Sequence, residues 1–439
     1  MEKLIDFSLA LNMHIFFISK IFMKVFADLH IHSKYSGATS SKMDIENLEK
    51  GAREKGINLL GTGDFLHPNW LRELKTNLTE DGSGILKTSS GFNFILTCEV
   101  NNVFEHEGRV RKVHNLILAK NFGVVEQIRE ALGKFGDLDK DGRPTLNLTC
   151  AELLEILSGI DKDIEVIPCH VWTPYYGVFG SKSGFDDLKE CYQEKTNLIH
   201  ALETGLSSDP EMNWAVSKLD KYNLVSNSDS HSPSPFRLGR EGNVFELKEL
   251  TYKEILKAIR EKNSKRFLFT IEVDPSYGKY HWDGHRKCGV CLSPEEAKKF
   301  NNICPVCGKP LTLGVLHRVL DLADRPLGYK PKNAIPFKRI LPLQELISVY
   351  YKTEPTSKKV LQIYQKLIKH FGSEFSVLLE AEKNKMEKII DEKLAELIIK
   401  NREGKIKIKP GYDGVYGKII LDGEGDEKRK TPQKGLFEF

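Results

Sequence analysis

The feature that most constrains the fold is a regular alternation of short apolar runs and helix-like stretches between Val25 and about Phe245. The runs have the length and β-branched character of buried strands. Repeated strand–helix units favour a parallel sheet or a β/α barrel, and this number of strands favours a closed or nearly closed barrel over a small open sheet. The expected strands cover residues 25–32, 57–64, 92–100, 114–119, 164–170, 198–204 and 223–229.

One intervening helix can be described in detail from the sequence. Residues 41–55 place Leu48 and Ala52 on one helical face, with Ser40 or Ser41 as a candidate N-cap. Gly56 is expected to end this helix, because glycine readily adopts the left-handed conformation found there. In folds of this class, functional side chains gather where strands end. The strand ends are therefore the first place to look for chemistry.

Histidines and acids occupy most of these strand ends. His30 and His32 form an HxH pair, and residues i and i+2 of a strand point to the same face. An apolar core has no use for many buried imidazoles and carboxylates unless a metal partners them. His114 is the exception in position, because it stands at the start of its expected strand. The candidate metal ligands are His30, His32, Asp64, Glu99, His114, His170, Asp229 and His231.

These donors limit the choice of metal. A mixture of nitrogen and oxygen donors suits Zn²⁺, Mn²⁺ or Fe²⁺, and also admits Mg²⁺, but it does not suit Ca²⁺, which prefers oxygen alone. The ligands are too many for one ion, so we expect two or three catalytic ions with a carboxylate such as Glu99 bridging them. Clustered cations activate water and neutralise charge on a phosphate. We assign catalytic roles to Asp229, His231 and Glu99.

The order of these motifs resembles the PHP (polymerase and histidinol phosphatase) superfamily. The resemblance implies a distorted (β/α)7 barrel with a trinuclear site, whose ligands would be the eight residues given above. Many members carry an aspartate shortly after the HxH, where this chain has Tyr35-Ser36-Gly37. Many also have a histidine directly after the second-motif aspartate, where this chain has Phe65; His67 is a candidate substitute. We therefore expect the third metal to bind weakly.

A second metal site is indicated by the cysteines. Cys288-x2-Cys291 and Cys304-x2-Cys307 are separated by 12 residues, a spacing typical of a structural four-cysteine zinc site. Such a site stabilises a module too small to have its own core. The other cysteines are scattered singly, which indicates a reducing cytosol rather than a secreted disulfide framework. They are Cys98, Cys150, Cys169 and Cys191.

Composition divides the chain into five parts. We expect a metallophosphoesterase barrel over 23–275, the zinc module over 276–330, a basic helical region over 331–410 and a flexible tail over 411–439. Residues 330–409 carry 18 Lys and Arg against 10 Asp and Glu. This excess is typical of a phosphate-binding surface and equally of a solvated helical surface. The fifth part, residues 1–22, is apolar, but Lys20 interrupts it, no small-residue cleavage site follows, and it is short for a membrane span. We expect an over-extended start before Met23 and a cytoplasmic protein with no membrane partner.

The layout of barrel, zinc module and basic helices resembles the archaeal endonuclease Q family of DNA-repair enzymes. The resemblance extends from Met23 over nearly the whole chain and includes SNSDSHSP (226–233), LGREGNVFE (238–246), HRVLDLADRP (317–326) and PGYDGVYGKI (410–419). It implies a metal-dependent DNA endonuclease that cuts on the 5′ side of deaminated bases (hypoxanthine, uracil, xanthine) or at abasic sites. One alternative is a small-molecule phosphatase of the histidinol-phosphate type, which would not need the added modules. The other is a non-catalytic DNA-binding accessory protein with a relic metal site, which would be expected to have lost ligands.

Candidate contacts to DNA follow two of the metal motifs. An enzyme that flips a damaged base out of the duplex needs aromatic surface, and Trp172, Tyr175 and Tyr176 come directly after His170. Packing at the barrel rim explains them equally well. Arg237 and Arg240 follow the DxH pair and are candidate phosphate clamps, although surface ion pairs explain them equally well.

A candidate partner motif ends the chain. Gln433, Leu436 and Phe439 have the spacing of the motif that docks on the sliding clamp PCNA, although the second terminal aromatic is missing. DNA and this clamp are therefore the expected partners.

Overall fold

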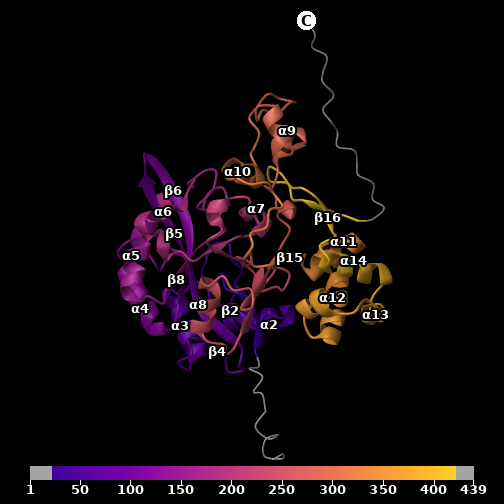
Figure 1. The fold of residues 1–439 in the computed structure, drawn as a ribbon. Coiled ribbons are helices and arrows are strands. Elements are labelled where there is room, and N and C mark those ends of the chain that lie inside the picture. The colour runs from indigo at the N-terminus through magenta and orange to yellow at the C-terminus, as the bar shows by residue number, and fades with distance from the viewer. Residues whose placement is uncertain (1–21, 422–439) are drawn as a thin grey trace, which may run out of the picture.

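The computed structural model describes residues 22–421. The expected over-extended start and the clamp-docking residues Gln433, Leu436 and Phe439 lie outside the described residues, apart from Phe22. Figure 1 shows three parts. The first is a mixed α/β part (residues 22–275), and the second is a protruding module around α9 (the cysteine module, residues 276–330). The third is a group of helices, α11 to α14, on the right of the picture, opposite α4 and α5. The domain boundaries expected from the sequence stay predictions.

The α/β part is built on a large sheet and a small one. The large sheet has the order β15-β12-β11-β1-β2-β5-β4-β3, with β6 and β7 on β5 and β8 on β6; β9 and β10 form a separate parallel pair. Each of the seven expected segments contains a strand. The bounds are β1 Met23–Asp28, β2 Leu59–Gly61, β3 Thr79–Glu80, β4 Leu86–Lys87, β5 Asn93–His106, β6 Arg109–Ala119, β7 Thr145–Leu146, β8 Glu165–Pro168, β9 Ala201–Glu203, β10 Asn223–Val225, β11 Gly242–Leu247, β12 Phe267–Glu272 and β15 Phe337–Arg339.

Hydrogen bonds just beyond the strands connect the two sheets. The backbone N–H of Val171, after β8, donates to the carbonyl of Glu203 at the end of β9 (3.1 Å). The backbone N–H of His32, after β1, donates to the carbonyl of Ser230, after β10 (3.0 Å). The succession β1, β2, β5, β6, β8, β9 and β10 therefore returns to its starting strand, and the carboxyl ends of its parallel strands meet at one rim.

One expectation about strand direction is corrected by the structure. Residues 92–100 and 114–119 were expected as strands of parallel units, but β5 and β6 form one long antiparallel hairpin. Glu107 and Gly108 form its turn, both with positive φ (52° and 71°), as a two-residue hairpin turn requires. Because β6 runs the other way, the first half of that strand lies at the rim. This explains why His114, opposite Asn101, can lie at the rim although it stands at the start of the expected strand 114–119.

Helices pack on the outside of the strands, as Figure 1 shows for α3, α4 and α5. The expected helix is α2 (Ile45–Lys55), and Gly56 ends it with φ 98° as expected. The cap is not Ser40 or Ser41: the Asp44 side chain accepts from the N–H of Asn47 and starts the helix four residues later than expected. The other bounds are α3 Pro68–Asn77, α4 Phe122–Leu132, α5 Cys150–Ile160, α6 Leu188–Tyr192, α7 Pro210–Trp214 and α8 Tyr252–Arg260.

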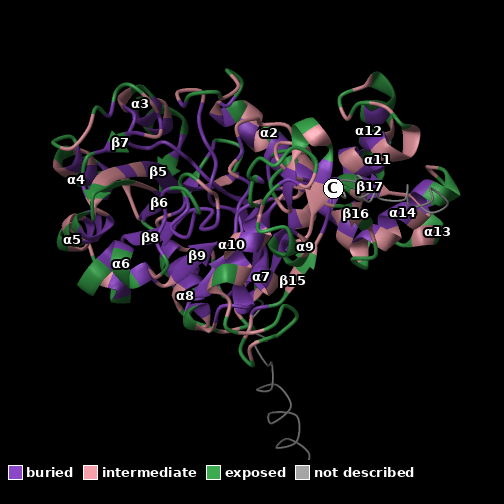
Figure 2. Ribbon diagram, turned by 90° about the horizontal axis from the view of Figure 1, so that it is seen from above, coloured by how far each residue is buried: buried purple, intermediate pink, exposed green. Residues whose placement is uncertain are grey.

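Burial is concentrated between the strands and these helices (Figure 2). Trp70 of α3 is fully buried, and its indole N–H donates to the carbonyl of Gly63 (2.9 Å). This side chain both fills the core and fixes the turn that precedes Asp64. Truncating such a residue to alanine costs about 3–5 kcal/mol, so the core rigidly holds the strand ends.

The cysteine module is small. It contains β13 (Asp283–His285), β14 (Val290–Leu292), α9 (Pro294–Lys299) and α10 (Val315–Leu322). Its separate buried cluster consists of Val290, Ala297, Cys304 and Leu311. A core of this size cannot offset the entropy of ordering the module, so another source of stability is needed.

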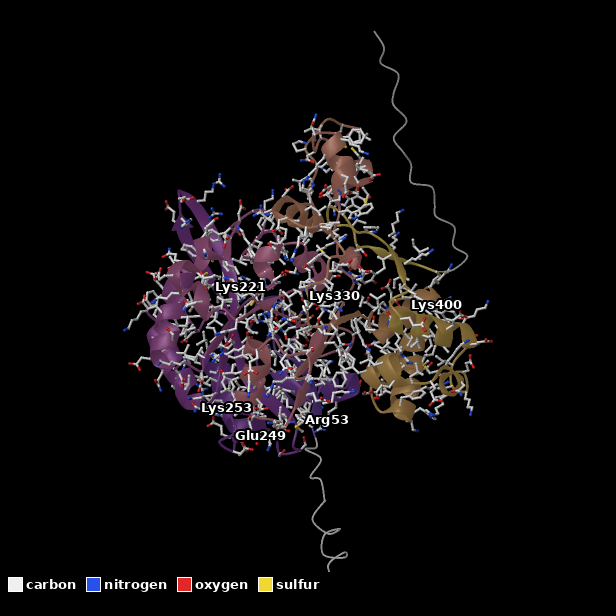
Figure 3. All side chains as sticks on the ribbon, viewed as in Figure 1. Arg53, Lys221, Glu249, Lys253, Lys330 and Lys400 are labelled. Atoms are coloured by element: carbon white, nitrogen blue, oxygen red, sulfur yellow. The ribbon has the colours of Figure 1, made fainter. Side chains whose placement is uncertain are left out.

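The C-terminal helices are α11 (Leu343–Tyr351), α12 (Lys358–Phe371), α13 (Lys383–Met386) and α14 (Glu392–Arg402), followed by the hairpin of β16 (Lys407–Lys409) and β17 (Lys418–Ile420). A buried ion pair between Lys55 and Glu374 (2.8 Å) joins them to the α/β part. Several cations of this basic region are paired locally, among them Lys385 with Glu382 and Lys400 with Glu396; Figure 3 shows Lys400 on these helices. Within residues 22–421, no helix has the length and apolar character needed to cross a bilayer.

Candidate metal centre

Side chains carried by three strands, β1, β5 and β10, meet at the rim in a first ligand group, His30, His32, Glu99 and Asp229. One donor atom from each residue lies within 4.8 Å of all the others. His32 Nε2 is 3.3 Å from Glu99 Oε2 and 3.1 Å from Asp229 Oδ1. His30 Nε2 is buried and has no hydrogen-bond partner. A buried polar atom without a partner is costly, and a cation held between these four donors would satisfy it.

A second ligand group, Glu99, His114 and His170, adjoins the first. His114 Nδ1 lies 2.6 Å from Glu99 Oε1, and His170 Nε2 lies 3.1 Å from the same oxygen. The two imidazole nitrogens are 3.3 Å apart and point at one position. Glu99 therefore turns one carboxylate oxygen to each group, and the bridging role expected from the sequence stays a prediction. Two neighbouring cations fit this donor set.

The backbone at three of these positions is strained. Asp64, His170 and Asp229 have φ of 48°, 31° and 48°, the left-handed region that side chains rarely adopt. Each such residue costs about 1–3 kcal/mol and persists where the surrounding structure enforces it. Gly205 packs against His170 so closely that an added Cβ would lie 2.5 Å from the Cβ of His170. The surrounding structure therefore holds Asp64, His170 and Asp229 in strained backbone conformations that fix the direction of their side chains.

Carboxylates and a hydroxyl behind the ligands orient the imidazole rings. His30 Nδ1 lies 3.0 Å from Glu203 Oε1, and His170 Nδ1 lies 2.9 Å from Thr173 Oγ1. Such partners fix the ring orientation of ligating histidines. His30 and Glu203 also form a third cluster of donors with Cys169. Sequence reasoning missed Glu203, although it ends an expected strand and the rule used for Glu99 would have found it.

Three of the predicted residues lie next to the ligand groups instead of within them. Asp64 Oδ1 lies 3.1 Å from His32 Nδ1, and Asp64 Oδ2 accepts from the N–H of Ser33 (2.6 Å), so this carboxylate stands behind the His32 ring. The His231 ring lies beside that of His32, tilted by 52° with the centroids 4.5 Å apart, and its side chain is 32% exposed. His67 Nε2 lies 3.1 Å from the carbonyl of Asp139. Among the described residues, the geometry thus gives Asp64 an orienting position and His67 a structural one.

Buried carboxylates and imidazoles shift one another's pKa values at the rim. Burial raises the pKa of the Glu99 carboxyl, but the imidazoles of His114 and His30 outweigh it and hold that pKa well below its usual range. Burial lowers the pKa of His114 to about 4 despite the nearby carboxylate, so its ring is neutral and can ligate. Burial also lowers the pKa of His30, but Glu203 and Glu99 raise it well above its ordinary value. The metal-free protein therefore holds a proton there that a bound cation would release.

Arg143 is a further residue at the rim that sequence reasoning missed. Its Nη1 lies 3.1 Å from Glu99 Oε2, and its side chain is 29% exposed, so part of the guanidinium faces solvent. Arginine in this position can contact a phosphate bound beside the ligand groups. It belongs to a loop (residues 141–144) with no motif, and no sequence signal pointed to it.

The predicted DNA-contact residues differ in exposure. Trp172 is buried, and its indole N–H donates to Asn213 Oδ1 (2.8 Å). Tyr176 is 38% exposed and stacks on the His114 ring (centroids 4.4 Å apart), and Tyr175 is 60% exposed. The guanidinium of Arg240 donates to the carbonyl of Ser228 (3.2 Å). Arg237 is exposed.

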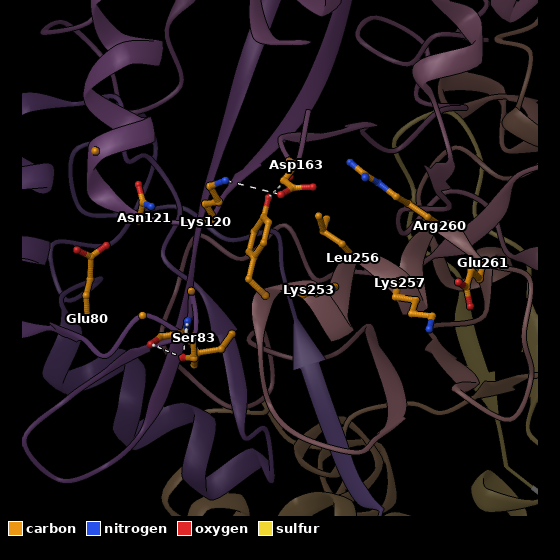
Figure 4. Close-up of a pocket in the computed structure, with 15 residues that line it drawn as sticks. Glu80, Ser83, Lys120, Asn121, Asp163, Lys253, Leu256, Lys257, Arg260 and Glu261 are labelled. Carbon is orange, nitrogen blue, oxygen red and sulfur yellow. Dashed lines mark hydrogen bonds and ion pairs between the residues drawn. The ribbon is translucent and has the colours of Figure 1, made fainter. Parts of the chain in front are cut away.

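Two cavities lie on opposite sides of the strands. One of about 310 Å³ is lined by Arg237, Arg240, Tyr277, Tyr280, His281 and Glu345. It adjoins the rim, since Arg240 contacts Ser228, the residue before Asp229. The other, of about 920 Å³, lies beside Lys120 and Asp163, where β6 ends and β8 begins, and thus at the edge of the strands away from the rim. Figure 4 shows Lys120 directed at Asp163 there.

The cysteine module holds a separate donor cluster. His285, Cys288, Cys304 and Cys307 each place one donor atom within 4.8 Å of the others. The structure thus brings together three of the four predicted cysteines, with a histidine that was not predicted. The Sγ of the fourth, Cys291, lies 3.9 Å from the carbonyl of Pro410. Burial raises the pKa of the Cys288 thiol to about 11, so a cation is needed there to hold it as a thiolate.

Among the solved structures similar to this chain are two that match it over almost its whole length. One is the crystal structure of the lesion-specific endonuclease PfuEndoQ from Pyrococcus furiosus, with a TM-score of 0.82 and 36% identity, covering 91% of this chain and 96% of that one. The other is endonuclease Q in complex with a 27-mer duplex substrate with an abasic lesion at the active site. It has a TM-score of 0.81 and 35% identity and covers 92% of this chain and 98% of that one.

Sequence comparison adds three matches. The chain is 37% identical over 253 residues to the uncharacterized protein MJ0043 of Methanocaldococcus jannaschii, a match that spans 56% of this chain and 31% of that protein. It is 29% identical over 417 residues to the uncharacterized protein YqxK of Bacillus subtilis, covering 90% of this chain and 99% of that protein. A family model described as the MJ0043 C-terminal domain matches residues 342–405.

Proposed function

We propose, from the premise that this chain belongs to the endonuclease Q family, that it is a divalent-metal-dependent DNA repair endonuclease which cuts the strand at damaged bases. The single observation that carries the proposal is the shared carboxylate of Glu99 between two buried ligand groups. We interpret the succession of strands from β1 to β10 as the distorted (β/α)7 barrel of the PHP superfamily.

The residues of the rim would hold two catalytic ions, one in each ligand group, and a third more weakly. When bound, ions of the Zn²⁺, Mn²⁺, Mg²⁺ or Fe²⁺ class supply an activated water and neutralise phosphate charge. The chain's own contribution is orientation: Glu203 and Asp64 fix the rings of His30 and His32. The half-exposed His231 faces the place where the reacting phosphate must enter, and Arg143 lies over Glu99 to contact a non-bridging oxygen.

The cavity beside Arg240 is our candidate pocket for a base flipped out of the duplex. Two buried polar atoms at its wall, His281 Nδ1 and Glu345 Oε2, have no hydrogen-bond partner. Hypoxanthine, uracil and xanthine share an N–H next to a carbonyl. The unpaired atoms of His281 and Glu345 would bind a base that forms hydrogen bonds with them more tightly than a base that leaves them unpaired. Tyr175 and Tyr176 stand exposed near the second ligand group, where they can stack on the displaced base or fill its gap.

The pocket is tested by comparing lesions. We expect His281→Phe to reduce cleavage at hypoxanthine and uracil by about tenfold or more, the usual penalty for an unmet polar partner, and to leave cleavage at an abasic site unchanged. An equal loss on all lesions would contradict the pocket, because an abasic site presents no base. Tyr175→Ala and Tyr176→Ala that leave lesion preference intact would remove the stacking role.

The activity itself is tested with end-labelled duplexes that carry hypoxanthine, uracil, an abasic site or no lesion. We expect metal-dependent nicking on the 5′ side of the lesion and no nicking of the intact duplex. Histidinol phosphate in a parallel assay tests the small-molecule alternative. Binding to DNA with no cleavage under any metal would instead support an accessory protein.

The tail motif at Gln433, Leu436 and Phe439 supports a second proposal, docking on a sliding clamp of the PCNA type. We expect the full chain to bind the clamp in calorimetry and Phe439→Ala to abolish binding while cleavage of short duplexes is unchanged. Equal binding by wild type and variant would contradict this assignment.

A further inference from the structure

The hairpin of the cysteine module fixes which residues face its metal site. β13 and β14 pair antiparallel, with His285 opposite Val290. Residues directly opposite each other in such a pair place their side chains on the same face. Val290 is buried in the small cluster that contains Cys304. His285 therefore lies on the face of the hairpin that meets the cysteines.

Cys291 lies on the other face. It follows Val290 in β14, and successive residues of a strand point to opposite sides. It stands opposite Gly284, and a Cβ on that glycine would lie 2.4 Å from the ring of Tyr412. The Sγ of Cys291 is 3.9 Å from the carbonyl of Pro410. This face of the hairpin is thus covered by residues 410–412.

In each metal-binding turn, a glycine in the left-handed region directly follows the second donor. In the second turn Cys304 and Cys307 are followed by Gly308, with φ 70°. In the first turn Cys288 is followed by Gly289, with φ 65°. His285-x2-Cys288-Gly289 therefore has the same layout as Cys304-x2-Cys307-Gly308. The two turns match when His285 takes the place of Cys304, whereas Cys291 is followed by Leu292 within a strand.

The donor distances agree with this frame. His285 Nδ1 lies 3.7 Å from Cys307 Sγ. Two tetrahedral zinc ligands at ordinary Zn–N and Zn–S bond lengths stand roughly 3.6 Å apart. We infer that the structural zinc of this protein is held by one imidazole and three thiolates, those of His285, Cys288, Cys304 and Cys307. Cys291 instead anchors the 410–412 segment to the hairpin.

The ligand set changes the charge of the site. Zinc with three thiolates and a neutral imidazole carries one negative charge fewer than zinc with four thiolates. Cys307 is exposed, so this charge faces solvent. For a module that operates beside a polyanion, the smaller negative charge reduces repulsion of phosphates.

Cobalt(II)-substituted full-length protein tests the inference, because the near-ultraviolet charge-transfer bands report only cobalt–thiolate bonds. We expect Cys291→Ser to keep the wild-type spectrum and the wild-type zinc content per chain. His285→Ala should lower zinc affinity by about tenfold or more. Cys304→Ser removes one of the three inferred thiolate donors and is the control variant that should lose charge-transfer intensity.

His285→Cys is a second variant that tests the same position if His285→Ala fails to fold. It keeps a ligand at the position and should convert the spectrum to the more intense one of four thiolates. The inference is overturned if Cys291→Ser loses charge-transfer intensity or zinc while His285→Ala retains both. It is also overturned if His285→Cys leaves the number of thiolates bound to cobalt unchanged.

Discussion

The rim and the cysteine module both gather metal donors, but they draw them from very different lengths of chain. The two ligand groups of the rim take theirs from positions 30 to 229, and five strands hold them, whereas the cysteine module takes its donors from positions 285 to 307. The rim stands on a continuous buried core, while the module has a buried cluster of four residues. The folded core positions the ligands of the rim, whereas metal binding must stabilise the fold of the module.

Backbone strain sharpens this contrast. Asp64, His170 and Asp229 of the rim are non-glycine residues in the left-handed region, which only a rigid surrounding enforces. The turns of the module use Gly289 and Gly308 for the same conformation, at little cost. A large core can hold strained ligands ready without metal, whereas a small module cannot.

The largest effect is expected from Glu99→Gln, which removes the shared carboxylate of both ligand groups. Cleavage of a hypoxanthine duplex should fall by about a thousandfold or more, because neither ion keeps its bridging charge. Thermal unfolding should stay near the wild-type midpoint, since the core is intact. Glu249→Gln, at an exposed position on the surface (Figure 3), is the control and should leave cleavage unchanged.

Removal of metal by a chelator should separate the two regions next. Amide exchange in β13, β14 and α9 should accelerate by roughly a hundredfold or more as the module opens locally. Exchange in β1, β5 and β6 should stay protected. Equal acceleration in both regions would break the contrast, because it would show that the rim also depends on metal to fold.

A smaller effect is expected from Glu203→Gln, which weakens the orientation of His30. Loss of such a partner lowers metal affinity by about 10- to 100-fold, so excess metal should restore cleavage. Glu165→Gln is the matched control: its carboxylate is also buried and lies 3.0 Å from a histidine, His200, at the other end of the strands. That control should lower stability but not metal affinity.

The smallest effect concerns pH. Burial raises the pKa of Glu272 to about 8 from an ordinary value of 4.5. The folded chain then holds a proton that the unfolded chain releases, so this contribution to stability is complete below pH 4.5 and is lost as pH rises through about 8. Glu272→Gln should flatten the decline of the melting midpoint between pH 6 and 8.5, a window chosen to lie about the raised pKa. A decline as steep as in wild type would contradict the assignment.

Much of the rim could be predicted from the sequence, because metal ligands at strand ends leave a signal independent of strand direction. Asp229 follows β10, as that rule expects, whereas Glu99 lies within β5, which continues past its expected end at residue 100. What failed depends on pairing: the antiparallel turn at Glu107 and Gly108 explains His114, and no local pattern announces it. Arg143 reaches the rim from an irregular loop, and such a contact is set by tertiary packing alone.

The cysteine module shows a different limit. The cysteine spacing predicts a metal site, but the first turn can be either His285-x2-Cys288 or Cys288-x2-Cys291. The strand register decides which of His285 and Cys291 faces the other donors. A single residue of shift moves a side chain to the other face. The left-handed glycines were visible in the sequence after Cys288 and Cys307, yet their meaning depends on the φ that the structure provides.

The measurement that tests the rim most directly is anomalous scattering from crystals of the full chain equilibrated with Mn²⁺. Two neighbouring peaks should appear, one between His30, His32, Glu99 and Asp229 and one between Glu99, His114 and His170, with Glu99 touching both. Well-ordered crystals that show manganese nowhere at the rim, or only at an isolated site away from Glu99, would contradict the account.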